Sequence, residues 1–220
     1  MKEFFKKTFT KENFKKFFRT YIWLMVLLFV IDIVTKWVIV NHFGVVTMES
    51  GARKGTGAIE LIKNFLYIGG AINSGAAFSL FAGSRIPLLL ISLVMTGGFI
   101  AYYIVQYKKL TTLYKVALAL MIAGGFGNLI DRAFYWKSTT GFGGVVDWIL
   151  VYFGKNDMNG FPMFNIADSC LVVGIFIIFI AIIIDEVKAS KKRRAKGEYR
   201  YSPEQLKEKE KESNEKDKSE

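Results

Sequence analysis

The sequence predicts an all-α membrane protein with four transmembrane helices and a small extracytoplasmic β-rich segment between the first and the second helix. Apolar residues make up 52% of the 220-residue chain, and they stand in long blocks instead of at the helical or strand period of a soluble domain. Four blocks approach the roughly 20 residues that a helix needs to cross a bilayer. Charged residues gather at the two ends and in short connecting stretches.

The first predicted element is a basic amphipathic segment over residues 1–20, in which phenylalanines stand among lysines. We expect it to lie on the cytoplasmic membrane surface. The first span follows over about 21–40. It is too long for the core of a signal peptide, and no small-residue cleavage site comes after it. We therefore expect this span to remain in the protein.

The region between the first two spans is polar and rich in glycine over 44–56, and mixes β-branched and aromatic residues with glycines over 59–82. This composition predicts short extended segments. The second span begins near Pro87, which suits the first turn of a helix, and ends near Tyr107. The third covers about 113–130, and its glycines Gly124, Gly125 and Gly127 predict close helix packing.

A polar, aromatic loop over 132–162 leads to the fourth span, over about 164–184, and a basic cluster at 191–194 follows. We expect residues 21–187 to form one four-span domain and the charged tail 188–220 to be a disordered cytoplasmic segment. Lys and Arg are richest at the N-terminus, in the turn 108–115 and after the fourth span, which places both termini in the cytoplasm. The other two loops then share the outer side.

Composition excludes several classes of function. The net charge is +11, but the basic residues flank apolar blocks and do not interleave with aromatic residues, so we expect no nucleic-acid partner. His42 and Cys170 are the chain's single histidine and single cysteine. This pair supports neither a zinc cluster nor an intramolecular disulfide, and we expect no metal and no cofactor.

The strongest chemical signal is a duplicated Asn-x-x-Asp pattern. Asn128 and Asp131 end the third span, and Asn165 and Asp168 begin the fourth. A spacing of three places both residues of each pair on one helical face, and antiparallel spans would bring the two faces to the same outer depth. Two nearby carboxyl groups share a proton, so that one takes a proton from water while the other protonates a leaving amine.

Each of these aspartates also has a structural interpretation. Asp168 could cap the fourth helix, and Asp131 could pair with Arg132 at the lipid headgroups. The two asparagines could orient the carboxyl groups, hold a substrate backbone or satisfy loop carbonyls, and the sequence leaves these alternatives open. The duplication of the pattern favours a site.

Other polar residues accompany the pattern. Asp32 and Lys36 stand four residues apart in the first span, which favours an ion pair that we interpret as structural. Asn73 opens a small-residue stretch, 73–79, that is either a tight turn or a place where a substrate strand docks. Asp147 is a third acidic candidate on the outer side. Cys170 is interpreted as a packing residue.

Taken together, these residues resemble the lipoprotein signal peptidases, the bacterial signal peptidase II family of intramembrane aspartic peptidases. The resemblance covers about residues 21–187 and includes five blocks in the family's order. They are Asp32 with Thr35 and Lys36; Asn73 with Gly75, Ala76, Ala77 and Phe78; Gly127 and Asn128 with Asp131 and Arg132; Val146 with Asp147; and Phe164 and Asn165 with Ala167 and Asp168.

The resemblance implies a multi-pass enzyme of the bacterial cytoplasmic membrane that cleaves prolipoproteins just before a diacylglyceryl-modified cysteine. It implies no metal or cofactor. Separately, we expect the protein to act as a monomer. The resemblance implies Asp131 and Asp168 as the catalytic pair. It further implies that Asn73, Asn128, Arg132 and Asn165 contact or frame the substrate, and that a supporting set surrounds the site: Asp32, Lys36 and Asp147. Membrane lipids are expected partners, with residues 191–194 contacting anionic headgroups.

Three other functions compete with this one. A Ser-Lys peptidase would use Lys36 with Ser74 or Ser79, but it would leave the duplicated pattern unexplained. A proton-coupled transporter would use the intramembrane acids as a relay, yet these residues cluster toward one face and no inverted repeat is apparent. A non-catalytic assembly protein would tolerate Asp131→Asn.

Overall fold

The computed structural model describes residues 17–44, 46–47, 58–73, 85–134, 144–153, 161–195 and 207–208. It contains four long helices, α3 (Ile22–His42), α4 (Arg85–Gln106), α5 (Thr112–Phe134) and α6 (Ile166–Ala195), and four strands, β1 (Val46–Thr47), β2 (Ile59–Ile62), β3 (Leu66–Asn73) and β4 (Val145–Val151). Most of the N-terminal basic segment, the stretch 74–79 and most of the charged tail lie outside the described residues.

The four predicted spans are confirmed as helices, each long and apolar enough to cross a membrane. The first three begin and end within a few residues of the predicted limits. The fourth continues past residue 184 to Ala195, because the residues after the apolar block are mostly good helix formers such as Lys, Glu and Ala. The chain forms two compact units, Met1–Ile178 and Phe179–Glu220, and the sheet and the polar site belong to the first.

Helix α5 is the central helix of the first unit. Both α3 and α4 pack against it, and half of its apolar window is buried, compared with 17% for α3 and for α4. Small side chains such as Ala117 and Ala119 are fully buried there. Large apolar side chains such as Val26 and Val94 remain exposed on the outer helices, as expected for surfaces that face lipid.

Glycines allow α5 to approach its neighbours closely, as the sequence predicted. A Cβ atom on Gly124 would meet the backbone of Ala167 in α6, and one on Gly125 would meet Thr96 in α4. A Cβ atom on Gly127 would meet the Asp32 carboxylate of α3 and the Ala167 side chain. Small residues in membrane helices serve this kind of close contact. The packing therefore brings α3 and the start of α6 to the same end of α5.

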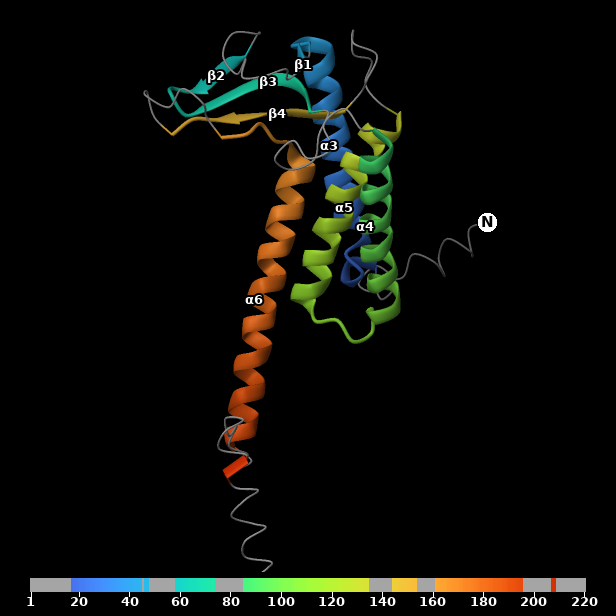
Figure 1. The fold of residues 1–220 in the computed structure, drawn as a ribbon, viewed down its shortest axis with the longest axis vertical. Helices are drawn as coiled ribbons and strands as arrows, with labels where there is room; N and C mark the ends of the chain where they lie inside the picture. Colours follow the sequence, from blue (N-terminus) through green and yellow to red (C-terminus); the bar gives the residue numbers. More distant parts are fainter. Residues whose placement is uncertain are drawn as a thin grey trace, which may run out of the picture. The chain divides into compact units, whose positions relative to one another are not determined.

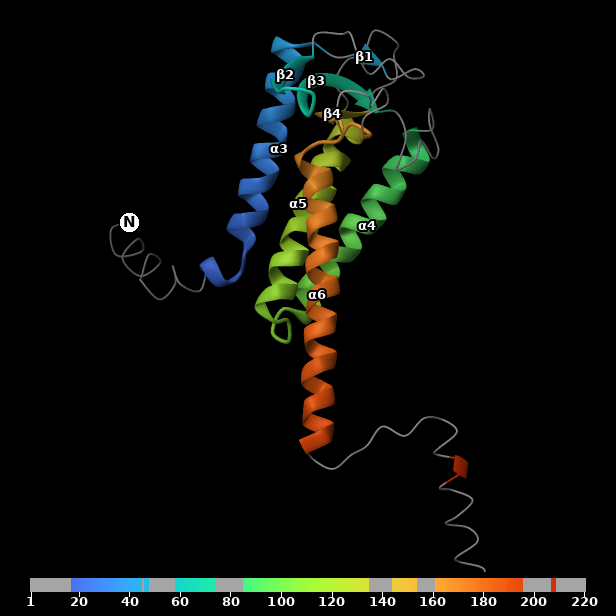
Figure 2. The same ribbon diagram turned by 90° about the vertical axis from the view of Figure 1, so that its left-hand side faces the viewer.

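The four strands form one sheet that lies across the C-terminal ends of α3 and α5 and the start of α6 (Figures 1 and 2). Strand β3 is its centre: β4 pairs antiparallel along one edge, while β2 (antiparallel) and β1 (parallel) share the other. The sheet is anchored on the bundle by a small apolar cluster around Ile39, Ile72 and Val146.

The predicted β-rich segment between the first two spans is confirmed, but the sequence analysis missed β4. This strand lies in the region 132–162, which was interpreted as a loop. Its pairing partner, β3, is separated from it in the sequence by two helices, α4 and α5. The local sequence pattern therefore does not indicate that the two strands pair. The consequence is functional, because β4 carries Asp147 into the sheet directly above the helix ends.

Candidate active site

A cluster of buried polar side chains lies where the sheet meets the ends of the helices. Lys36, Asn165, Asp32, Asp131 and Asp147 are each at most 1% exposed. They come from two helices, α3 and α5, from β4 and from the residue that precedes α6. Burial of charged groups at this depth is tolerated only when the groups are paired and hydrogen-bonded, and the contacts below supply that pairing.

Lys36 forms a double ion pair at the centre of the cluster. Its Nζ atom lies 2.7 Å from Asp32 Oδ2 and 2.8 Å from Asp131 Oδ2. The same atom donates to Asn128 Oδ1 at 3.3 Å. Asp131 Oδ2 also accepts the backbone N–H of Val146 at 3.1 Å. One lysine thus neutralises carboxylates from two helices and ties α3 to α5.

The ion pair between Asp32 and Lys36 within α3 is confirmed, and the bridge from Lys36 to Asp131 is new. The sequence offered Arg132 at the headgroups as the structural partner of Asp131. Asp131 is instead buried and held by Lys36. The Arg132 guanidinium donates to the backbone carbonyl of Asn128 at 3.3 Å.

Asn165 and Asp168 form a reciprocal cap at the start of α6. The Asp168 N–H donates to Asn165 Oδ1 at 2.8 Å, and the Asn165 N–H donates to Asp168 Oδ2 at 3.1 Å. This is the geometry of a capping box, with Asn165 as the N-cap and Asp168 at the third helical position. The capping role that the sequence offered for Asp168 therefore belongs in part to Asn165.

Asp32 reaches the same helix start from α3. Its Oδ1 atom accepts the N–H of Ala167 at 2.9 Å, which satisfies another of the unpaired donors of the first turn. A carboxylate at a helix N-terminus is stabilised by the positive end of the helix dipole. The position of Asp168 is thus set by its own helix cap and by a carboxylate of a neighbouring span.

Asn128 connects the two halves of the duplicated pattern. Its Nδ2 atom donates to Asp168 Oδ1 at 2.7 Å, while its Oδ1 atom accepts from Lys36 and from Asn165 Nδ2 at 3.2 Å. The prediction that the two Asn-x-x-Asp ends share one outer depth agrees with these contacts. Of the roles left open for the two asparagines, the structure shows that both orient carboxyl groups.

Asp147 enters the cluster from β4. Its Oδ1 atom accepts from Asn165 Nδ2 at 2.8 Å, and its Oδ2 atom accepts from Asn73 Nδ2 at 2.9 Å. Burial, followed by the negative charge of Asp168, raises the pKa of Asp147 to about 8, against the opposing effects of the Asn73 hydrogen bond and the Lys36 charge. The raised pKa favours the protonated form of Asp147 near neutral pH.

The charge balance of the cluster favours one neutral carboxyl group. Four carboxyl groups face two cations, Lys36 and Arg132, and the ammonium of Lys36 is shared by Asp32 and Asp131. The remaining two acids both accept hydrogen bonds from Asn165: the Asp147 carboxyl group accepts from its side-chain amide, and the Asp168 carboxyl group accepts from its backbone N–H. Two adjacent acids, one protonated and one ionised, can move a proton from water to a leaving group.

All nine site residues that the sequence predicted lie in described parts of the chain, and all belong to this network. Within those parts, no three His, Cys, Asp or Glu side chains are placed to hold a metal ion. Sequence reasoning missed the backbone donors of Val146 and Ala167, because residue type carries no signal for a main-chain hydrogen bond across elements. It also missed that Gly127 makes room for the Asp32 carboxylate.

Comparison with known proteins identifies the family. A sequence profile described as signal peptidase (SPase) II matches residues 24–184. A lipoprotein signal peptidase of Halalkalibacterium halodurans is 37% identical over 161 residues, which cover 73% of this chain and 90% of that protein. A lipoprotein signal peptidase of Bacillus subtilis is 36% identical over 173 residues, which cover 79% of this chain and 99% of that protein.

Solved structures agree with the sequence matches. A bacterial membrane enzyme determined by the in meso method at 2.3 Å resolution superposes with a TM-score of 0.58 at 32% identity, covering 76% of this chain and 89% of that one. A second such structure, at 1.9 Å, gives a TM-score of 0.55 at 32% identity over 74% of this chain and 92% of that one. The profile covers most of the chain, and the relatives match it along most of their length. The chain therefore belongs to the signal peptidase II family of membrane peptidases.

Proposed function

We propose that this peptidase removes the signal peptides of prolipoproteins, cleaving just before the diacylglyceryl-modified cysteine, and that it does so with an aspartic acid–base pair. The observation that carries the mechanism is that the carboxyl groups of Asp147 and Asp168 both accept hydrogen bonds from Asn165, Asp147 from its side-chain amide and Asp168 from its backbone N–H. The two curated relatives described above are both lipoprotein signal peptidases.

Asp168 is one member of the catalytic pair, whether its partner is Asp147 or Asp131. Its contacts suit the ionised member of the pair. It accepts hydrogen bonds from the Asn128 side chain and from the Asn165 backbone, and it stands in the first turn of α6. Amide donors and a helix N-terminus both stabilise a carboxylate. Asp168 is also partly accessible, whereas the other three carboxyl groups are buried.

The second member is Asp147 or Asp131, and the contacts favour Asp147. The sequence pattern pointed to Asp131, which is 2.8 Å from the Lys36 ammonium and accepts the Val146 N–H. A carboxylate so neutralised is a poor proton donor. Asp147 carries a proton because of its burial and the charge of Asp168. We therefore assign the acid role to Asp147 and a positioning role to Asp131, and the Discussion describes the variants that decide between them.

In the proposed reaction a water molecule attacks the scissile carbonyl. The Asp168 carboxylate takes a proton from this water, and the protonated Asp147 donates a hydrogen bond to the carbonyl oxygen, whose bond to carbon becomes single as the C–O bond to water forms. Collapse of the tetrahedral adduct breaks the C–N bond, and the leaving amine takes a proton from the pair. Protons and bonds balance without a metal or a cofactor.

The surrounding polar residues would hold the pair and the substrate. Asn128 and Asn165 orient the carboxyl groups by their hydrogen bonds, and Asn73 donates to Asp147 from β3. We propose that Asn73, Asn128, Arg132 and Asn165 frame the substrate backbone around the scissile bond. Asp32 and Lys36 support the site from α3. Lys36 serves as an ion-pair partner, which argues against its use as the base of a Ser-Lys peptidase.

We further propose that both termini are cytoplasmic, so that the site faces the outer side of the membrane. Support comes from the lysines of the turn between α4 and α5 and from exposed basic residues at the end of α6, including Lys191, Lys192 and Arg193, since cytoplasmic flanks carry the excess of Lys and Arg. The same proposal includes three further points: the domain spans residues 21–187, it acts as a monomer, and the basic cluster at 191–194 contacts anionic lipid.

Cleavage of a synthetic diacylated prolipoprotein by the purified chain in detergent tests the function. We expect a single cut before the lipidated cysteine, identified by mass spectrometry of both products. The matched control is the same peptide without the diacylglyceryl group, which should be cut far more slowly, because the lipid supplies most of the apolar contact with the membrane enzyme. No cut by a folded enzyme, or equal cutting of both peptides, would contradict the proposal.

The activity should also fall at alkaline pH. Because the pKa of Asp147 is raised from 3.8 to about 8, the protonated form of the acid is lost as the pH rises through that value. We expect kcat/KM to decline above about pH 8 with unit slope. Between pH 3.8 and 8 the folded state also binds this proton more tightly than the unfolded chain, so this group's contribution to stability falls as the pH rises. A flat profile to pH 10 would contradict the role of Asp147.

A further inference from the structure

The part of the sheet furthest from the polar site has one apolar face. We call this part the sheet tip; it comprises β2, residues 66–68 of β3 and residues 149–153. Ile68 pairs with Ile59 on one side and with Ile149 on the other, and Leu66 pairs with Ile62 and with Val151. Directly paired residues point to the same side of a sheet. Six branched apolar side chains therefore share one face: Ile59, Ile62, Leu66, Ile68, Ile149 and Val151.

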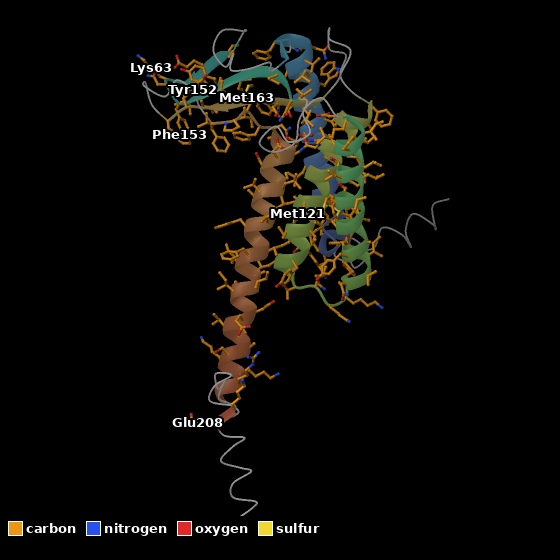
Figure 3. The ribbon with its side chains drawn as sticks, in the orientation of Figure 1. Lys63, Met121, Tyr152, Phe153, Met163 and Glu208 are labelled. Carbon is orange, nitrogen blue, oxygen red and sulfur yellow. The ribbon has the colours of Figure 1, made fainter. Side chains whose placement is uncertain are left out.

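This apolar face is turned toward the membrane. Asp147, which reaches the helix ends, has the same parity in β4 as Ile149 and Val151, so all three point to the same side. Figure 3 shows Phe153 beneath the end of β4, on the side of the helices. Ile59 and Ile62 are 51% and 52% exposed, and Phe153 is 73% exposed. Apolar side chains are thus exposed on the face that continues outward from the active site.

The opposite face of the sheet tip carries the polar side chains of Glu60 and Tyr67, beside the buried Leu150. Glu60 Oε1 accepts hydrogen bonds from the Tyr67 hydroxyl and from the Asn64 N–H, both at 2.6 Å. Figure 3 shows Lys63 above the sheet, on the side away from the helices. Apolar groups toward the bilayer and polar groups toward water are the distribution found in elements that lie in the membrane interface.

Position favours lipid over another partner for this face. The sheet crosses the outer ends of the membrane helices (Figures 1 and 2), so its lower face lies at the depth where the spans leave the hydrocarbon. Nearby in the chain, the first turns of α6 expose Val172 and Ile175 at 66% and 58%, as lipid-facing residues do. The sheet tip therefore offers an exposed apolar face close in the chain to exposed apolar residues of a helix long and apolar enough to cross a membrane.

We propose that the sheet tip is an interfacial membrane anchor, whose apolar face, ending in Ile62 and Phe153, is inserted among the phospholipids of the outer leaflet. The inference does not depend on which acids are catalytic. It gives the sheet a second role besides carrying Asp147, because an embedded tip fixes the depth of the active site relative to the bilayer.

Depth-dependent fluorescence quenching tests the anchor. Phe153→Cys and Lys63→Cys are each made in a Cys170→Ala background and labelled with an environment-sensitive fluorophore; the full chain is then reconstituted in phosphatidylethanolamine–phosphatidylglycerol vesicles. A small share of the lipid carries a nitroxide on the acyl chain near the headgroup. We expect quenching at position 153 to exceed that at position 63 by about twofold or more, because the two positions lie on opposite faces. Ile62→Cys reports on the same face and replaces Phe153→Cys if that variant does not fold.

The result that overturns the anchor is equal or absent quenching at the two faces in folded, active protein. A second result would also overturn the anchor, because it would show that the substrate occupies this face. If the fluorophore at position 153 is unquenched in vesicles but becomes shielded when a lipidated substrate peptide is added in detergent, the face belongs to the substrate and not to the bilayer. Quenching at position 153 that is unchanged by the peptide supports the lipid assignment.

Discussion

Asp168→Asn and Asp147→Asn should each lower kcat/KM for cleavage of a diacylated prolipoprotein by about 10²- to 10⁴-fold, the range that a positioned acid or base contributes. Asparagine keeps the size of the side chain and one acceptor oxygen, so the hydrogen bond from Asn128 to residue 168 and that from Asn73 to residue 147 can persist, while the second one, from Asn165, is lost. The main loss is proton transfer. Binding should therefore change little, and the loss should appear in kcat.

Asp131→Asn separates the two possible pairs. If Asp131 positions Lys36 and the Val146 backbone, the Asp131→Asn variant loses stability and some activity. Its remaining activity still declines above about pH 8, because Asp147 still titrates there. If Asp131 is the acid, as the sequence pattern suggested, Asp131→Asn is inactive and Asp147→Asn keeps substantial activity with an unchanged pH profile. Asp185→Asn, at an exposed position late in α6, is the matched control and should behave as the wild type.

The spans and the helix caps were accessible to sequence reasoning because their causes are local. A block of about 20 apolar residues has few alternatives to a membrane helix. The spacing of Asn165 and Asp168 is a capping spacing, and the structure uses it as one. Gly124, Gly125 and Gly127 were assigned to close packing, and each lies against a neighbouring helix.

The features that the sequence did not predict depend on contacts between distant segments. Strand β4 is stable because it pairs with β3, and neither strand contains a signal for the other. The bridge from Lys36 to Asp131 joins residues on different spans, whereas the pair with Asp32 follows from a spacing of four. Asp147 was named as a third acidic candidate, and the family resemblance implied a supporting role for it; its burial beside Asp168, which raises its pKa, now favours it as the acid.

Lys36→Met should destabilise the protein by about 3–5 kcal/mol, the usual effect of removing one partner from a buried ion pair. Methionine has a similar length but no charge, so the Asp32 and Asp131 carboxylates lose the ammonium that lies within 2.8 Å of both. In detergent this corresponds to a fall on the order of 10 °C in the unfolding midpoint for a chain of this size. Activity should fall as well, since Asp32 also holds the start of α6, the helix that carries Asp168.

The exposed Lys109→Met, in the turn after α4, removes the same charge and serves as the control, with an expected change within about 0.5 kcal/mol. The double variant Lys36→Met with Asp131→Asn identifies the physical origin of the effect. Because it removes one of the two stranded carboxylates along with the cation, it should be more stable than Lys36→Met alone, with a coupling energy of about 0.5–3 kcal/mol between the two sites. Strict additivity of the two substitutions would show that the Lys36–Asp131 bridge does not stabilise the fold, and the positioning role assigned to Asp131 would then have to rest on its hydrogen bond to Val146 alone.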